Sequence, residues 1–327
     1  MDAHRRSPIG AQLVDAAILV LSVALIGWVG VIVAARVSDE SEPGGHATGV
    51  APPPAGPADA LTSARQREGW NLVWHDEFDQ ASCPSRANWR FEHGFVRNGE
   101  LQWYQPENAY CRDGELVLEA RREETRNPHY QPGSTHWQRN RHVANYTSAS
   151  IASKYHFTYG RAEALIRIDP RLGSWPAFWT LGDGYRHAIR VWPATGEVDI
   201  MEYYRDLVLG NVCVPKKSWC GWSSTRQSLA GLGGQDWADR FHLWAMDWSP
   251  RRIDLFMDGR LVNRFPVARA SLGGRPNPYV NRPASLLLSQ ALGGVHGGDP
   301  THTGFPLRLE VKYVRVYQRA REVGRMN

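Results

Sequence analysis

The chain has 327 residues, of which 42% are hydrophobic and 22% are charged, so it can bury a sizeable core and is not disordered throughout. Its 31 glycines and 21 prolines are scattered rather than periodic, which excludes a collagen-like or coiled-coil chain. The formal net charge is +5, but the sequence contains no run of five or more basic residues. The charge therefore does not indicate a nucleic-acid partner.

The first long apolar segment is expected to be a transmembrane signal-anchor over residues 13–36. Residues 16–35 carry no charge, and twenty residues at about 1.5 Å each span the ~30 Å hydrocarbon core. Basic residues precede this run and acidic residues follow it, which predicts a cytoplasmic N-terminus over residues 1–12. The alternative is a secreted protein whose signal peptide is cleaved near Ala35, although the apolar run is long for such a peptide. Both interpretations place the remainder outside the cytoplasm.

The next features agree with export. Residues 37–66 are rich in proline, glycine and alanine and nearly free of large apolar side chains, so we expect a linker that does not fold. Four cysteines suggest two disulfides in an oxidising compartment, and three pairings are open. Proximity in the sequence favours Cys83 with Cys111 and Cys213 with Cys220. No CxxC motif supports a zinc or thioredoxin-type site.

Residues 67–319 are expected to form one all-β domain, followed by a short tail over residues 320–327. Apolar and polar side chains alternate over residues 161–168, as in half-buried strands. Residues 253–262 contain two such runs joined by Asp-Gly, which is a strong hairpin signal. No clean helical period and no long repeat follows the anchor. Many short strands separated by turns indicate a sandwich or a barrel.

Three carboxylates lie within one otherwise apolar strand, GEVDIME over residues 196–202. Glu197 and Asp199 share a strand face, and a single β-bulge would bring Glu202 to that face too. Repulsion between carboxylates placed so close together raises the pKa of at least one of them. A glycosidase uses such a pair, because one carboxylate attacks as the nucleophile while its neighbour keeps a proton as the general acid.

Two other interpretations of these acids are a solvated edge-strand face and a calcium site. The apolar and tryptophan neighbours of the segment do not suit an exposed face. The glycines and loop pattern of a calcium loop are also missing.

GEVDIMEYY over residues 196–204 resembles the ExDxxE catalytic signature of glycoside hydrolase family 16, in the branch that includes laminarinases and agar-type galactanases. The resemblance extends over about residues 69–319 and includes LVWHDEFD, NGELQWY, GSWPAFWTLG and VKYVRVYQ in the expected order. It implies a concanavalin A-like β-jelly-roll sandwich with an open carbohydrate cleft on its concave sheet. Position by position, it implies that Glu197 is the nucleophile, that Glu202 is the general acid/base, and that Asp199 orients the nucleophile. No cofactor is required.

Five further residues are candidates for the substrate-binding surface. Aromatic rings suit this role because the C–H faces of sugars pack on them, although either tryptophan of the WPAFW segment can instead belong to the core. The candidates are Asn98, Trp175, Trp179, Trp192 and His296.

Two positions depart from the family pattern. Lys312 stands where relatives often have an acidic residue that holds a structural calcium ion, and a cation opposes such a site. We therefore predict no metal. Ser289 stands where an asparagine is common, which affects the contacts to substrate.

The first expectation is a membrane-anchored, extracytoplasmic retaining endo-β-glycosidase that hydrolyses a polysaccharide, with laminarin-type β-1,3-glucan as the first substrate. The alternatives are an agar-type galactan hydrolase and a transglycosylase that remodels envelope or capsule glycan. A non-catalytic glycan-binding protein is disfavoured because all three acids are present. No sequence feature specifies an oligomeric state.

Overall fold

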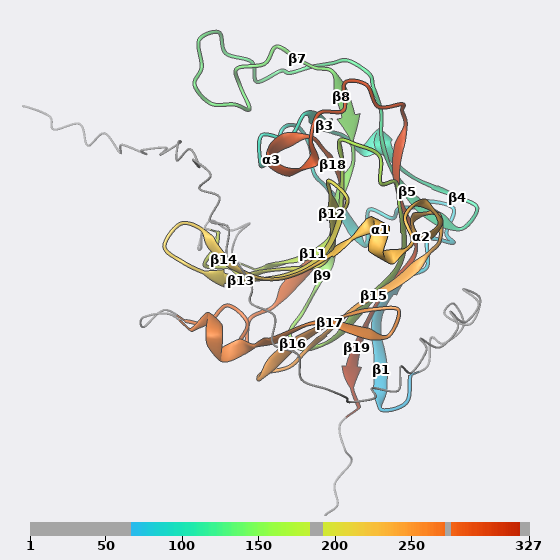
Figure 1. The fold of residues 1–327 in the computed structure, drawn as a ribbon, viewed down its shortest axis with the longest axis vertical. Coiled ribbons are helices and arrows are strands. Elements are labelled where there is room, and N and C mark those ends of the chain that lie inside the picture. Colours follow the sequence, from blue (N-terminus) through green and yellow to red (C-terminus); the bar gives the residue numbers. More distant parts are fainter. Residues whose placement is uncertain (1–66, 184–191, 272–275, 321–327) are drawn as a thin grey trace, which may run out of the picture. The chain divides into compact units, whose positions relative to one another are not determined.

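The computed structural model describes residues 67–183, 192–271 and 276–320, which form two antiparallel β-sheets packed face to face (Figure 1). The predicted N-terminus, anchor and linker, residues 1–66, lie outside the described residues, as do residues 321–327 of the predicted tail. Within the three described ranges, no helix is both long and apolar enough to cross a membrane.

The first sheet has eight strands. In spatial order they are β17 (Arg260–Pro266), β16 (Arg252–Met257), β15 (His242–Trp248), β10 (Gly160–Ile168), β19 (Leu307–Arg319), β5 (Glu115–Ala120) and β4 (Ala109–Arg112), with β1 (Trp70–Asp76) paired to β19. The Asp-Gly hairpin is confirmed, because it joins β16 to β17.

The second sheet has seven strands and carries the acidic segment near its middle. In spatial order they are β14 (Cys220–Ser228), β13 (Leu207–Pro215), β12 (Glu197–Tyr204), β11 (Ser174–Gly182), β18 (Ala284–Leu292), β9 (Ser150–Phe157) and β2 (Trp89–Phe91).

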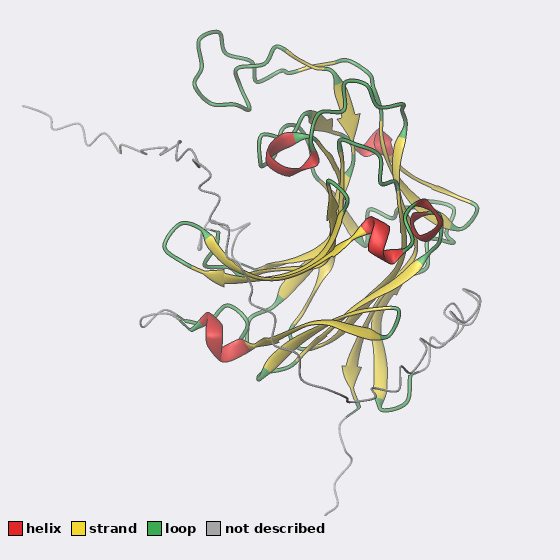
Figure 2. Ribbon diagram, viewed as in Figure 1, coloured by secondary structure: helices red, strands yellow, loops and turns green. Residues whose placement is uncertain are grey.

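Short elements complete the described part of the chain, and Figure 2 shows helices only as brief turns between strands. Two small ladders pair β3 (Gln102–Tyr104) with β8 (Tyr146–Ser148) and β6 (Thr125–Arg126) with β7 (Val143–Ala144). The helical turns are α1 (Leu229–Leu232), α2 (Gln235–Ala238), α3 (Gly294–Gly297), η2 (Pro106–Asn108) and η3 (Val267–Ala270). This architecture confirms the predicted all-β sandwich.

The main core lies between the two sheets and follows the period-2 pattern. On β10, Ala162, Ala164 and Ile166 point into it, while on β12 Val198 and Ile200 do so from the opposite sheet. Burial of such side chains stabilises the sandwich by about 25 cal/mol per Å² of apolar surface. Met201 and Tyr203 of β12 belong to the same core, so Glu197, Asp199, Glu202 and Tyr204 are left to face the other side of the sheet.

The two disulfides pair as sequence proximity predicts. Cys83 is bonded to Cys111, which ties the segment after β1 to β4. Cys213 is bonded to Cys220, which ties β13 to β14 beside their connecting turn.

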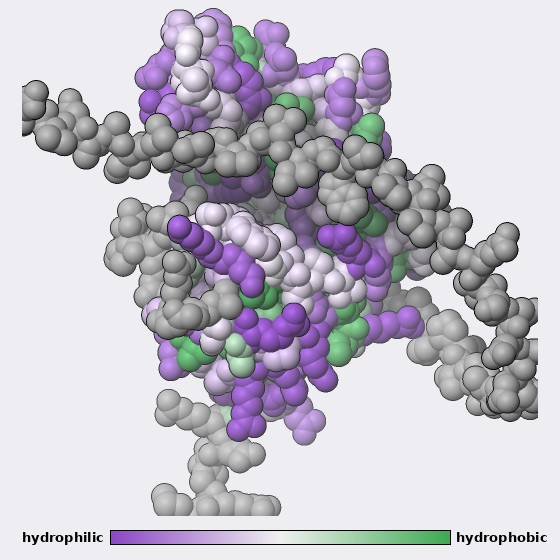
Figure 3. All heavy atoms as spheres, turned by 60° about the vertical axis from the view of Figure 1, so that its left-hand side comes forward, coloured by the Kyte–Doolittle hydropathy of each residue, from purple (hydrophilic) through white to green (hydrophobic). Residues whose placement is uncertain are grey.

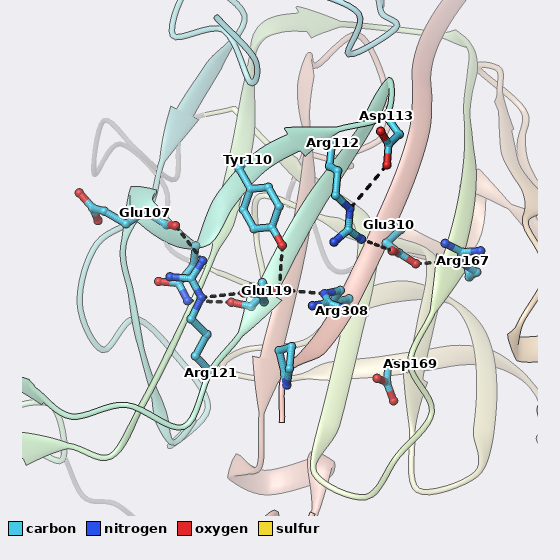
Figure 4. Close-up of polar contacts among 12 residues, drawn as sticks. Glu107, Tyr110, Arg112, Asp113, Glu119, Arg121, Arg167, Asp169, Arg308 and Glu310 are labelled. Carbon is cyan, nitrogen blue, oxygen red and sulfur yellow. Dashed lines mark hydrogen bonds and ion pairs between the residues drawn. The ribbon is translucent and has the colours of Figure 1, made fainter. Parts of the chain in front are cut away.

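The outer face of the eight-stranded sheet carries a network of ion pairs (Figure 4). Glu119 accepts hydrogen bonds from Tyr110 at 2.7 Å, Arg121 at 2.7 Å and Arg308 at 2.8 Å. A second carboxylate, Glu310, accepts one from Arg167 at 2.7 Å. These pairs neutralise charge on the face turned away from the core.

Candidate active site

A β-bulge in β12 places the three acids on one face. Asp199 pairs with Asn211 and Glu202 pairs with Leu209, so β12 has one residue more than β13 between these two rungs. The extra residue returns Glu202 to the side of Glu197 and Asp199, which confirms the parity argument.

The three acids line a cleft of about 470 Å³ that crosses the seven-stranded sheet from β14 to β18. All five predicted binding residues line the same cleft: Asn98, Trp175, Trp179, Trp192 and His296. Several lining residues were not anticipated from the sequence: Arg97, Tyr204, Asn211, Trp222, Ser224 and Arg226. The structure therefore gathers residues from segments far apart in the chain around one concave surface.

Two of the predicted sugar-stacking tryptophans also make direct hydrogen bonds to the acids. The indole N–H of Trp192 donates to Glu197 Oε2 at 2.6 Å. The indole N–H of Trp175 donates to Glu202 Oε1 at 2.7 Å. Each glutamate thus has its own donor, and each tryptophan is fixed by the acid that it contacts.

Asn211 connects the remaining carboxylate to Glu202. Its amide Nδ2 donates to Asp199 Oδ2 at 3.1 Å and to Glu202 Oε2 at 2.8 Å. Pairing of β12 with β13 sets this contact, since Asn211 lies directly opposite Asp199. The hairpin between the two strands is the sequence signal that could have identified Asn211.

The pKa values of all three acids are raised. Burial raises the pKa of Glu197 to about 7, against the hydrogen bond from Trp192 and together with repulsion from Glu202. Burial likewise raises the pKa of Glu202 to about 7, against the hydrogen bonds from Trp175 and Asn211. Burial, and then the two glutamates, raise the pKa of Asp199 well above its usual range. Near neutral pH the cluster can therefore hold both a proton and a negative charge.

The entry into β12 is fixed by close packing at Gly196. This residue has φ +79°, and a Cβ atom there would lie 2.8 Å from Pro278 Cβ and 2.9 Å from Tyr279 Cε1. The hydroxyl of Tyr279 donates to the carbonyl of Glu197 at 2.9 Å. Only glycine suits both this φ and this contact, so Gly196 sets where Glu197 begins its strand.

Arg97 supports the cleft beside the nucleophile candidate. Its guanidinium lies 5.1 Å from the centre of the Trp179 ring and pairs with Glu92. Its positive charge acts to lower the pKa of Glu197, against the larger effect of burial. The neighbouring Asn98, which the sequence did identify, contacts Glu100 through its amide at 3.4 Å.

The other two predicted binding residues, His296 and Trp179, make separate contacts in the cleft. His296, on α3, stacks on Tyr204 at 4.6 Å and meets the edge of Trp175 at 5.0 Å. The indole N–H of Trp179 donates to the hydroxyl of Ser289 at 3.2 Å. Ser289, which stands where relatives commonly have an asparagine, therefore contacts a cleft-lining side chain directly.

The side chains around Lys312 do not fit the structural calcium ion that relatives often carry. Its ammonium lies 3.6 Å from Glu115 and 4.8 Å from the centre of the Phe241 ring. Among the described residues, no three histidine, cysteine, aspartate or glutamate side chains cluster as metal ligands.

Comparison with known proteins agrees with this geometry. The sequence model of glycosyl hydrolases family 16 matches residues 99–313. A β-glucanase from Rhodothermus marinus is 34% identical over 267 residues, which cover 76% of this chain and 85% of that enzyme. The laminarinase catalytic domain from Thermotoga maritima superposes with a TM-score of 0.66 at 30% identity, covering 77% of this chain and 100% of that one. A structure described among endo-acting O-glycanases that human gut bacteria use to initiate mucin breakdown gives a TM-score of 0.70 at 29% identity, covering 78% and 92%.

Proposed function

Since this chain belongs to glycosyl hydrolases family 16, we propose that it is a retaining endo-β-glucanase that hydrolyses β-1,3-glucan of the laminarin type. The observation that carries the proposal is the cluster of three acids in one cleft, with pKa values of about 7 for two of them. The likeness to a β-glucanase and to a laminarinase supports the choice of polysaccharide.

In the proposed reaction, ionised Glu197 attacks the anomeric carbon while protonated Glu202 gives its proton to the leaving glycosidic oxygen. The C–O bond breaks and a glycosyl-enzyme ester forms on Glu197. Glu202, now ionised, takes a proton from water, the water oxygen attacks the anomeric carbon, and Glu197 leaves. Asp199 positions Glu197 by sharing a hydrogen bond with it, which stabilises the ionised nucleophile.

The tryptophans complete the proposed site. Trp192 and Trp175 orient the two glutamates through separate indole donors. Asn98 and Trp179 line the same cleft. Asn98 is exposed and offers an amide to the sugar, whereas Trp179 is only 7% exposed and packs in a small apolar cluster. A sugar bound there would lie between the nucleophile and the proton donor.

We also propose that the enzyme works outside the cytoplasm, tethered to the membrane by residues 13–36. The apolar run and its flanking charges support this, and two disulfides suit an oxidising compartment. Alkaline carbonate extraction of cell membranes should leave the chain in the membrane fraction. Recovery in the culture medium with an N-terminus near Arg36 would instead mean a cleaved signal peptide.

The test of function is product release by the purified full chain on laminarin, mixed-linkage glucan, agarose, porphyran and carrageenan. Laminarin should yield oligosaccharides, and Glu197→Gln should lower the rate by about 10³-fold or more, because the nucleophile is removed. Added oligosaccharide acceptors would separate hydrolysis from glycosyl transfer. Near-normal activity of the folded Glu197→Gln protein would refute the assignment of the nucleophile.

A further inference from the structure

The edge strand β14 contributes three cleft-lining side chains that the proposed reaction does not use: Trp222, Ser224 and Arg226. They lie at alternate positions, so they share one strand face. Figure 3 turns the β13–β14 side of the molecule forward and shows a pale surface of intermediate hydropathy beside strongly hydrophilic side chains.

Strand register places this face in line with the acids. Asp199 on β12 pairs with Asn211 on β13, and Asn211 pairs with Ser224 on β14. In the same way Glu202 pairs with Leu209, which pairs with Arg226. Since neighbouring strands are about 4.8 Å apart, β14 lies roughly 10 Å from the strand that carries the acids. The cleft runs across the strands, so a polysaccharide lying in it would reach β14 beyond the reacting sugars.

The side chains on this face suit a sugar ring. Trp222 is 42% exposed, which leaves an indole face open at the cleft. Arg226 is exposed on the same face, and its fork of N–H donors can bind pairs of hydroxyl oxygens. An aromatic face beside a polar donor is the combination that binds the apolar face and the hydroxyl edge of one sugar.

The Cys213–Cys220 disulfide holds this face in place. Cys213 pairs directly with Trp222 across the hairpin, and Cys220 is two residues before it. A hairpin cross-linked at this point loses less conformational entropy when a ligand binds to it than a free edge strand would.

We propose that Trp222 and Arg226 form an outer glycan subsite, which binds a sugar of the same polysaccharide beyond those at the acids. The proposal rests on the proposed endo-glycosidase function and extends it to a preference for long chains. Each sugar that reaches β14 adds contacts with Trp222 and Arg226, so catalytic efficiency should increase with oligosaccharide length until this subsite is filled.

The test compares Trp222→Ala with Trp219→Ala on laminari-oligosaccharides of increasing length. Trp219 is the matched control, because it is 58% exposed on the turn of the same hairpin and lies outside the described lining of the cleft. We expect Trp222→Ala to lower kcat/KM about tenfold on the longest oligosaccharides and less on the shortest, and Trp219→Ala to follow the wild type. An equal loss at every length, or no loss, would overturn the subsite.

Affinity electrophoresis tests the subsite without assuming that laminarin is the substrate. Glu197→Gln protein, with and without Trp222→Ala, is run in gels that contain each polysaccharide of the panel. Retardation on any of them that weakens with Trp222→Ala supports the subsite even if laminarin is not hydrolysed. Equal retardation of the two proteins, or no retardation on any polysaccharide, counts against it.

Discussion

At the scale of single residues, each of the two glutamates accepts a hydrogen bond from a different indole N–H group. The indole N–H of Trp192 donates to Glu197, and that of Trp175 donates to Glu202. Each hydrogen bond lowers the pKa of its own acid, against the larger raising effect of burial. The pair therefore gives two separate positions at which a substitution can change the pH dependence of the reaction.

The pH profile of kcat/KM should be bell-shaped with its maximum near pH 7, since both glutamates have pKa values of about 7. Trp192→Phe removes a donor that lowers the pKa of Glu197, so the acidic limb should move up by about one pH unit. Trp175→Phe acts on Glu202, the proposed proton donor, so the basic limb should move up instead. Initial rates from pH 4 to 10 measure both limbs.

The two phenylalanine variants act as controls for each other, because both keep an aromatic ring in the cleft. A loss of stacking alone would lower the rate at every pH and leave both limbs in place. Movement of the same limb in both variants would contradict the assignment of nucleophile and acid.

The sequence was informative about the acids and much less so about their donors. Three acids at this spacing are unusual in an apolar strand, so the pattern alone selects Glu197, Asp199 and Glu202. The donor roles of Trp192 and Trp175 depend on the rotamers of both partners and on the turn over residues 192–196 that precedes β12. No local pattern encodes such contacts.

At the scale of elements, the start of β12 depends on Gly196. Gly196→Ala should reduce stability by about 1–2 kcal/mol from the positive φ alone, and by more from contact with Pro278 and Tyr279. Since Glu197 follows directly, the rate on laminarin should also fall about tenfold. Thermal unfolding and initial rates measure the two effects.

Gly259→Ala is the matched control for this variant. Gly259 has φ +78° in the β16–β17 turn, and a Cβ atom there would meet nothing within 4 Å. Gly259→Ala should lose the stability that the positive φ costs, but no more than that, because the new Cβ atom meets no neighbour. Its rate on laminarin should be unchanged. If the two alanine variants behave alike, the packing of Gly196 does not position Glu197.

Local elements were predictable where neighbours in the chain become neighbours in space. The Asp-Gly turn between β16 and β17 is one example. The bulge in β12 was also predictable, because strand parity and a shared face for the acids conflict without it. The position of β18 beside β11 was not, since it depends on a pairing between residues more than a hundred positions apart.

At the scale of the whole molecule, the pKa of a carboxyl group shifts in opposite directions on the two sheets. On the outer face of the eight-stranded sheet, arginines surround carboxylates (Figure 4). Partial burial acts to raise the pKa of Glu119, but hydrogen bonds from Arg121, Tyr110 and Arg308 outweigh it, so the pKa is lowered. Such a group stabilises the fold above its unfolded pKa, and this contribution is lost as the pH falls through the folded pKa. In the cleft, burial raises the pKa of the acids, so ionising them costs stability.

Glu202→Gln should therefore increase the free energy of unfolding at pH 8 but not at pH 4. The pKa of Glu202 is about 7 in the folded protein and lies near its ordinary value after unfolding, so folding takes up a proton between these values. Wild-type stability falls as the pH rises through this window, while a glutamine has no proton to lose. The gain at pH 8 should be on the order of 2–3 kcal/mol, as measured by urea unfolding at both pH values with unchanged m-values. A gain of equal size at pH 4 would assign the effect to packing, and a loss at pH 8 would mean that ionised Glu202 stabilises the fold through its contacts with Trp175 and Asn211.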